Sequence, residues 1–225
     1  MNVNKPKQYI DKEFTFLGKK FYIDQGAHIP RHSTEFITVH YINSINNLSK
    51  SDLVVADVGT GTGVLSVSIA SQCPNVKKVY AIDLFENALQ VASINRSNFN
   101  LEDKIELLQG DLFEPLLDKQ VDVIIANLPF ADDNKMKALR SEVIKYEPMT
   151  GIYGGRTGFE LYERLFKQLE KYSYFRYLKG LWIYCNLEHK PRIEYFHRSL
   201  FNNFNLNIVE DKYKPYYLHA YFHRR

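Results

Sequence analysis

The sequence predicts an α/β fold in which a mostly parallel β-sheet is covered by helices on both faces. Three observations support this prediction. From residue 53 onward, short continuous apolar runs alternate with longer segments of helical periodicity, which is typical of parallel strands joined by helices. A glycine-rich turn connects the first of these strands to the first helix. The last two apolar runs lie close together in the chain, which favours an antiparallel pair at the C-terminal end.

The first 48 residues form a short N-terminal extension in this interpretation. Residues 14–24 contain two strand-like runs around a Leu-Gly-Lys turn and predict a β-hairpin. Residues 33–45 have the apolar spacing of a helix. A chain of 225 residues suits one main domain with room for such an extension. We therefore divide the chain into an extension at 1–48 and a main domain at 49–225.

Seven strands and four helices are predicted in the main domain. The strands are expected at residues 53–56, 76–82, 105–108, 121–126, 180–184, 205–209 and 217–222. The helices are expected at residues 64–70, 86–98, 158–172 and 191–201. Because the last two strands are separated only by a short segment around Asp211–Pro215, we expect them to pair in antiparallel fashion.

The composition is that of a globular protein without membrane or export segments. Hydrophobic residues make up 45% and charged residues 24% of the chain, which are ordinary values. No apolar run approaches the roughly 18 residues that span a bilayer, and the N-terminus lacks the apolar core of a signal peptide. Cys73 and Cys185 are far apart and fit no metal or redox spacing. We therefore expect a cytoplasmic protein with reduced cysteines and no membrane contact.

Charge is distributed unevenly along the chain, although its net value is only +3. Residues 1–50 contain 7 basic and 4 acidic side chains, residues 51–160 contain 10 and 16, and residues 161–225 contain 12 and 6. The positive ends suit either an acidic partner such as nucleic acid or ordinary solvated helix faces. The aromatic and basic segment from Tyr213 to Arg225 likewise suits base stacking or a terminal hairpin.

A glycine loop follows the first strand of the main domain and opens a helix. Glycines permit close backbone approach to a ligand, and a helix N-terminus presents oriented N–H groups. A dinucleotide fingerprint needs a third glycine where Val64 stands, so the spacing argues against a nicotinamide cofactor. At the end of the preceding strand, a carboxylate can attract the cationic amino-acid part of S-adenosylmethionine. The predicted cofactor residues here are Asp57, Gly59, Thr60, Gly61 and Gly63.

Acidic residues end the next two predicted strands as well. Asp83 lies about 20 positions beyond the loop, where a carboxylate accepts hydrogen bonds from ribose hydroxyls. Asp111 ends the following strand and suits the adenine amino group. We assign both residues, with their neighbours Leu84 and Leu112, to a cofactor crevice at the sheet edge. The alternatives are that Asp83 caps the next helix and that Asp111 is a simple turn residue.

Four segments of the chain resemble motifs of a known family, and together they cover residues 14–172. They are Ile29–Glu35, the glycine loop, the tetrapeptide Asn127-Leu128-Pro129-Phe130, and Glu147-Pro148 with Gly154–Phe159. These motifs are similar to those of the HemK-like (PrmC-type) protein-glutamine N5-methyltransferases. That family belongs to the class I methyltransferases that use S-adenosylmethionine, and the resemblance implies their Rossmann-like seven-stranded fold.

The resemblance also implies a catalytic role for the tetrapeptide. In the family, the Asn side-chain oxygen and the next backbone carbonyl accept the two hydrogens of a planar NH2 group. These groups correspond to Asn127, which would also contact the cofactor, and to the carbonyl of Leu128. Pro129 completes the motif and Phe130 would stack on the flat substrate group. Glu147 is expected to shape the substrate pocket or, alternatively, to be a solvated loop carboxylate.

This sequence departs from the family pattern at several places. Leu128 replaces the usual proline, but Leu retains the carbonyl that acts as acceptor, and Phe130 replaces tyrosine. The usual Glu-x-Gly pattern is missing between Leu181 and His189. Only about 13 residues precede the predicted hairpin, where family members that act on bacterial release factors have a helical domain. We therefore do not expect a release factor to be recognised in the usual way.

Several functions remain open at this point. The leading hypothesis is methylation of a glutamine side chain in a protein. The alternatives are an amino-group methyltransferase for an RNA or DNA base, one for a small molecule, and a non-catalytic protein that binds S-adenosylmethionine. We expect no metal site, because the pairs His28/His32 and His219/His223 have no accompanying cluster of cysteines, histidines or carboxylates.

Overall fold

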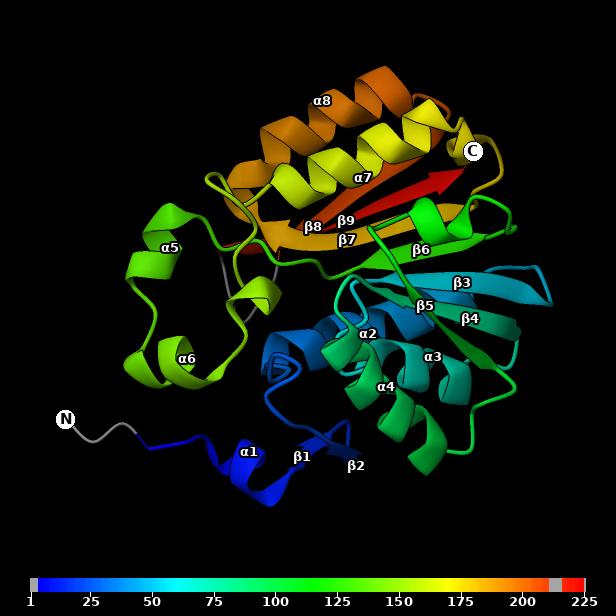
Figure 1. The fold of residues 1–225 in the computed structure, drawn as a ribbon. Coiled ribbons are helices and arrows are strands. Elements are labelled where there is room, and N and C mark those ends of the chain that lie inside the picture. Colours follow the sequence, from blue (N-terminus) through cyan, green and yellow to red (C-terminus); the bar gives the residue numbers. More distant parts are fainter. Residues whose placement is uncertain (1–3, 211–215, 225) are drawn as a thin grey trace.

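The computed structural model describes residues 4–210 and 216–224. Its centre is a twisted sheet of seven strands in the order β5-β4-β3-β6-β7-β9-β8 (Figure 1). These seven strands are β3 (Leu53–Val58), β4 (Val76–Asp83), β5 (Ile105–Gln109), β6 (Val123–Ala126), β7 (Gly180–Asn186), β8 (Phe204–Glu210) and β9 (Tyr217–Arg224). A separate hairpin consists of β1 (Glu13–Phe16) and β2 (Lys19–Tyr22).

The sheet is parallel except at β9. Strand β3 pairs in parallel with both β4 and β6, while β9 runs antiparallel to both β7 and β8. The predicted fold class is confirmed, and so is the antiparallel pairing of the last two strands, although residues 211–215 lie outside the described residues. The chain reverses its direction of strand addition at β3, between β4 and β6. In open α/β sheets, the crevice above such a reversal is the usual ligand site.

Helices cover both faces of the sheet, as Figure 1 shows. One face carries α2 (His32–Asn46), α3 (Val64–Gln72) and α4 (Glu86–Asn98), and the other carries α7 (Glu160–Lys171) and α8 (Lys190–Leu200). The remaining helices are α1 (Lys7–Asp11), α5 (Asp133–Lys137) and α6 (Ser141–Tyr146), with short 3-10 turns at Glu114–Leu116, Met149–Gly151, Tyr174–Arg176 and Leu187–His189. Helices α1, α5 and α6 were not predicted from the sequence, because they are only five or six residues long and bury few side chains.

Successive residues of the central strands enter two separate apolar cores. On β7, Trp182 and Tyr184 belong to the core under α2 and α3, whereas Leu181 and Ile183 belong to the core under α7 and α8. Successive side chains along a strand point to opposite faces of the sheet. A strand that is buried on both faces is therefore apolar along its length. This arrangement explains why β7 is buried along its whole length.

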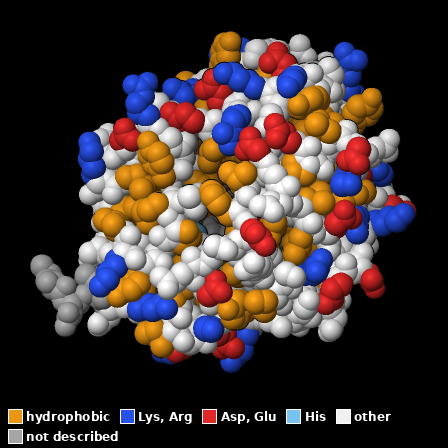
Figure 2. All heavy atoms as spheres, viewed as in Figure 1, with side chains coloured by type: hydrophobic (Ala, Val, Ile, Leu, Met, Phe, Trp, Pro, Cys, Tyr) orange, Lys and Arg blue, Asp and Glu red, His pale blue; other side chains and the backbone are white. Residues whose placement is uncertain are grey.

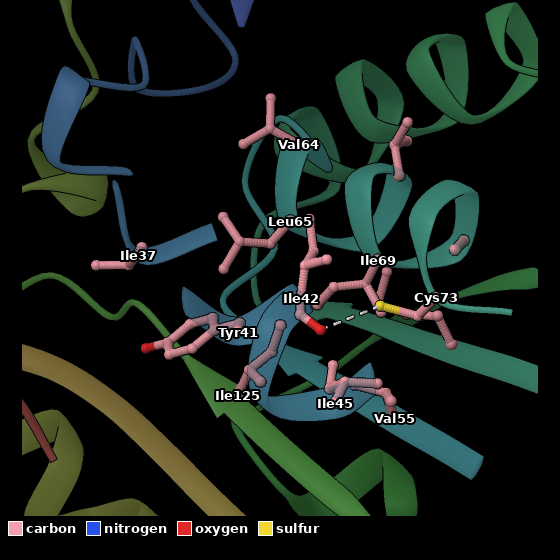
Figure 3. Packing of buried hydrophobic residues seen from close by; sticks show 14 of the residues in the cluster. Ile37, Tyr41, Ile42, Ile45, Val55, Val64, Leu65, Ile69, Cys73 and Ile125 are labelled. Carbon is pink, nitrogen blue, oxygen red and sulfur yellow. Dashed lines mark hydrogen bonds between the residues drawn. The ribbon is translucent and has the colours of Figure 1, made fainter. Parts of the chain in front are cut away.

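Figure 3 shows the first of these cores, between α2, α3 and the sheet. In this view Leu65 of α3 lies above Tyr41 and Ile42 of α2, and Ile125 of β6 lies below Tyr41. The thiol of Cys73 lies 3.9 Å from the carbonyl oxygen of Ile42.

The N-terminal extension packs onto the main sheet layer rather than standing apart from it. Asn95 of α4 is fully buried, and its side chain accepts a hydrogen bond from the Tyr22 N–H at 2.7 Å. Its amide nitrogen donates to the carbonyls of Tyr22 and Thr62 at 2.9 and 2.8 Å. One side chain therefore joins the β1–β2 hairpin to the glycine loop. Among the described residues, no helix has both the length and the apolar character needed to cross a bilayer.

Candidate active site

A cavity of about 430 Å³ opens where β3, β4, β5 and β6 end, at the crevice expected from the strand order. Figure 2 shows apolar side chains gathered around a hollow on this face. Seven stretches of chain line the cavity, and most were predicted as parts of the site. The stretches are 26–34, 59–65, 82–88, 110–112, 127–129, 148–153 and, on α7, Leu161 with Arg164.

The glycine loop forms the floor of the cavity and touches the tetrapeptide. Gly59 and Gly63 both have φ of +79°, a region that favours glycine. A Cβ on Gly59 would lie 2.8 Å from a methyl carbon of Leu128, so a side chain there would collide with the tetrapeptide. Gly59, Thr60 and Gly61 line the cavity, whereas Gly63 packs against Ala92 outside its wall.

Asp57 lies beneath the glycine loop and does not reach the cavity wall. Its Oδ2 accepts hydrogen bonds from the hydroxyls of Thr60 and Ser66, both at 2.7 Å. Only 1% of the residue is exposed, and desolvation raises the pKa of its carboxyl to about 6. The structure thus places Asp57 as an internal support of the loop.

Asp83 faces the cavity and connects it to the loop. One carboxylate oxygen accepts the Gly61 N–H at 2.9 Å, and the other accepts the Phe85 N–H at 3.0 Å. Burial raises the pKa of Asp83 above its ordinary value. Leu84 and Phe85 follow as half-exposed apolar side chains at the rim. Phe85 is the N-cap residue of α4, which begins at Glu86, so the second contact holds the residue before the helix and is not a side-chain cap on its first turn.

Asp111 and Leu112 also line the cavity, at its β5 end. The Arg164 guanidinium donates to Asp111 at 2.6 Å, and the Gln168 amide donates to the other oxygen at 3.3 Å. Both partners belong to α7, more than 50 positions away, and the sequence analysis did not include them. Their spacing of four residues places them on one face of the helix. This spacing is the feature of the sequence from which their joint contact with one residue could have been predicted.

Three members of the tetrapeptide line the cavity, and the fourth does not. Asn127, Leu128 and Pro129 are in the wall. The ring of Phe130 packs edge-on against Tyr184 and Tyr217, with centroids 5.6 and 5.4 Å apart, outside the described lining. Within the part of the chain that the structure describes, the Asn127 amide has no hydrogen-bond partner, so its oxygen is available to a ligand.

Two buried side chains that the sequence analysis missed hold the tetrapeptide in place. The hydroxyl of Tyr162 accepts the Leu128 N–H at 3.1 Å and donates to the carbonyl of Tyr184. The Asn186 amide donates to the carbonyl of Phe130 at 2.9 Å. Tyr162 lies among the buried residues of the amphipathic helix α7, and Asn186 ends the buried strand β7, so no local pattern distinguished them from ordinary core positions.

Glu147 is buried behind the cavity wall, and the alternative of a solvated loop carboxylate is wrong. Only 1% of its side chain is exposed. It contacts three neighbours from the N-terminal extension: Nδ1 of His28 at 2.6 Å, the N–H of Ile29 at 3.2 Å, and the guanidinium of Arg31. Burial by itself would raise the pKa of Glu147, but His28 and Arg31 offset it and hold the pKa below its usual value.

The residues that line the cavity are suited to bind S-adenosylmethionine. Gly61 lines the cavity, and a Cβ at this position would meet no protein atom within 4 Å, so the loop backbone is open to a ligand here. Carboxylates at the ends of β4 and β5 offer acceptors for ribose and adenine, and Leu84, Leu112 and Leu161 offer apolar walls. In the described ranges, no group of three histidine, cysteine, aspartate or glutamate side chains is placed to hold a metal ion.

The chain resembles known methyltransferases in sequence. Residues 42–148 match a family model described as the methyltransferase small domain. Proteins named release factor glutamine methyltransferase are similar to it: one from Clostridium acetobutylicum is 33% identical over 171 residues, and one from Bacillus subtilis is 35% identical over 170. These alignments cover 74% and 73% of this chain, but only 58% and 57% of the relatives. The chain thus spans less than two thirds of their length.

Solved structures support the fold. A ribosomal protein L11 methylase from Lactobacillus delbrueckii subsp. bulgaricus superposes with a TM-score of 0.62 at 21% identity, covering 90% of this chain and 84% of that one. The human METTL16 catalytic domain, in complex with an RNA hairpin, superposes with a TM-score of 0.70 at 14% identity, covering 90% and 74%. At these identities the likeness concerns the fold alone.

Proposed function

This chain belongs to the class I methyltransferases and is a relative of the release factor glutamine methyltransferases, and from this premise we propose that it methylates the side-chain amide nitrogen of a glutamine in a protein. One observation supports the proposal above all. Asn127 and Leu128 line the same cavity as the glycine loop and Asp83. The acceptors for an NH2 group and the residues for the methyl donor therefore share one chamber.

The proposed chemistry follows from the poor nucleophilicity of an amide nitrogen, whose lone pair is delocalised. When bound, S-adenosylmethionine supplies an electrophilic methyl group on a sulfonium. The Asn127 side-chain oxygen and the Leu128 carbonyl accept the two N–H hydrogens and so orient the nitrogen. Such alignment of reactants can contribute roughly 7–11 kcal/mol. The same dipoles stabilise the positive charge that develops on nitrogen, and the surplus proton then leaves readily.

We assign the methyl donor to the crevice formed by the glycine loop, Asp83 and Asp111. The Asp83 carboxylate is held by two backbone N–H groups and remains open to the cavity, which suits ribose hydroxyls. Asp57 supports the loop through Thr60 and Ser66, a role that replaces direct contact with the amino-acid part of the donor. Phe130 likewise supports the tetrapeptide by packing instead of stacking on substrate.

A protein substrate is favoured over nucleic acid by the charge of the cavity. Among the described lining residues, Arg164 is the one arginine or lysine, and it is paired with Asp111. A polynucleotide would need several free cations along its phosphates. Release factors are the first substrates to test, because the relatives bear that name. A cytoplasmic location is part of the proposal and is supported by two buried free thiols, Cys73 and Cys185.

The decisive experiment supplies radiolabelled S-adenosylmethionine to the protein, together with cell extract or purified release factor. Products are then divided and treated with protease or nuclease. We expect the label to disappear with protease, and mass spectrometry to locate one added methyl on a glutamine nitrogen. Label that survives protease and disappears with nuclease would instead identify a nucleic-acid base as the acceptor.

The same experiment bears on the proposed division of the chain. We propose that residues 49–225 form the catalytic domain and that residues 1–48 complete its substrate wall. His28, Pro30 and Thr34 of the extension line the cavity, which supports this view. A variant that lacks the extension should therefore bind substrate poorly even where it folds.

A further inference from the structure

The Tyr162 hydroxyl contacts the tetrapeptide between the two groups that are proposed to accept the hydrogens of the substrate NH2, the Asn127 side chain and the Leu128 carbonyl. The Leu128 N–H belongs to the peptide group that joins Asn127 to Leu128. On one side of this group lies the Asn127 side chain, and on the other lies the Leu128 carbonyl. The Tyr162 hydroxyl accepts this N–H at 3.1 Å, and it lies 3.5 Å from the Leu128 carbonyl oxygen. The contact with Tyr162 therefore holds the peptide group that lies between the two proposed acceptors.

The hydroxyl has one hydrogen, and the distances to its two neighbouring carbonyls indicate which of them accepts it. The nearer acceptor is the Tyr184 carbonyl of β7, which makes a short hydrogen bond with Tyr162. The Leu128 carbonyl, at the distance limit of a hydrogen bond, keeps its lone pairs for a ligand. Tyr162 is fully buried, and burial raises the pKa of its hydroxyl well above the usual value, so the hydrogen is retained.

We propose that Tyr162 is a positioning residue for methyl transfer, which orients the Leu128 peptide so that the Leu128 carbonyl and the Asn127 oxygen converge on the acceptor nitrogen. The role rests on the function proposed above. It exists because position 128 is leucine: a proline there would have no N–H to donate. The link also joins the tetrapeptide to β7 and α7, so the acceptors are held by two elements distant in sequence.

The same protein contains a matched control for this contact. Tyr174 is also buried, and its hydroxyl accepts the Val121 N–H at 2.7 Å and donates to the Lys119 carbonyl. It makes the same two kinds of hydrogen bond just before β6 begins, whereas Tyr162 acts just after β6 ends. Tyr162→Phe and Tyr174→Phe therefore remove the same atoms and bonds at opposite ends of one strand.

The test compares the wild type with Tyr162→Phe, Tyr174→Phe, Leu128→Pro and the double variant Leu128→Pro/Tyr162→Phe. Tyr162→Phe leaves the Leu128 N–H buried without a partner, and a misplacement of about 1 Å costs about 100-fold in rate. We expect kcat to fall about 10- to 100-fold in Tyr162→Phe with an unchanged Kd for S-adenosylmethionine by calorimetry. In Tyr174→Phe, Tm falls and kcat stays within twofold of the wild type. The double variant has no unpaired N–H, and its kcat should exceed that of Tyr162→Phe about tenfold.

A second measurement does not depend on knowing the substrate. Amide hydrogen exchange at Leu128 should be slow in the wild type and in Tyr174→Phe, and at least tenfold faster in Tyr162→Phe. Unchanged exchange in Tyr162→Phe, or an equal loss of kcat in the two tyrosine variants, overturns the positioning role. If the wild type transfers no methyl to any glutamine, the proposed function is wrong, while the exchange experiment still decides whether Tyr162 holds this peptide.

Discussion

Replacing Glu147 with glutamine removes one negative charge from a buried cluster while keeping the shape of the side chain. The carboxylate contacts His28, Ile29 and Arg31, which belong to the N-terminal extension more than 110 positions earlier. Glu147 itself immediately precedes the cavity-lining stretch 148–151. The cluster therefore joins two parts of the substrate wall that the chain connects only distantly.

The expected loss of stability follows from burial. Removing one partner of a buried ion pair costs about 3–5 kcal/mol. The side chains of His28 and Arg31 are 30% and 35% exposed, so solvent can partly stabilise them after the change. We therefore expect a loss of about 2–3 kcal/mol, or a fall in Tm of about 4–12 °C for a chain of this size.

The pH dependence of stability provides a further sign of this cluster. The pKa of Glu147 is lowered in the folded state, so the folded protein binds fewer protons than the unfolded chain near that pKa. The stabilising contribution is present above the unfolded value of about 4.3 and is lost as pH falls through the lower folded value. Glu147→Gln should lack this acid-dependent part of the unfolding free energy.

The assay measures kcat, KM for the methyl acceptor, and Kd for S-adenosylmethionine. We expect Glu147→Gln to raise KM about tenfold or more, with little change in Kd, because the cofactor residues lie on other elements. Asp122→Asn is the control. Asp122 is also buried and binds Lys50 at 2.6 Å and the Val54 N–H at 3.0 Å, at the start of β6, away from the cavity. If Asp122→Asn raises KM as much as Glu147→Gln, the effect is general destabilisation and our reasoning is refuted.

Three other changes test the division of roles within the cavity. Asn127→Ala should leave Kd for S-adenosylmethionine within about twofold and reduce kcat roughly 100-fold or more, as when an oriented polar group is removed; a parallel loss of cofactor affinity would contradict it. Asp83→Ala should weaken cofactor binding by about tenfold or more, because two ribose acceptors are lost, and an unchanged calorimetric Kd would exclude Asp83 from the site. Desolvation raises the pKa of Asp57 to about 6. Between about pH 4 and 6 the folded protein therefore binds one proton more than the unfolded chain, and the free energy of unfolding decreases as pH rises through that window. Asp57→Asn should not show this decrease in urea unfolding measured from pH 4 to 7, and a pH profile that matches the wild type would show that Asp57 ionises normally.

Local patterns in the sequence were sufficient for the framework of the cavity. All seven strands of the main sheet, the five long helices that cover it and the first hairpin were predicted within a few residues of their observed bounds. The predicted glycine loop and the strand-end residues Asp83 and Asp111 do meet at one cavity. These features depend on periodicity and on short-range connectivity, because parallel strands necessarily bring their carboxyl ends to the same edge.

The direction of individual side chains depended on contacts that no local pattern encodes. Asp57 is adjacent to the cavity in sequence, yet its carboxylate is turned toward Thr60 and Ser66. The ring of Phe130 packs on β7 and β9 and leaves the cavity wall to its three neighbours.

The same distinction applies to Glu147 and Tyr162. Glu147 belongs to a predicted motif, but its partner Arg31 lies 116 positions away and could not be predicted from that motif. Tyr162 belongs to no motif and acts on Leu128, 34 positions away. A chain specifies strands and turns through neighbours along its backbone. Which buried polar atoms find one another is decided when distant segments pack, because a desolvated donor or acceptor must be satisfied by whatever the folded neighbours place beside it.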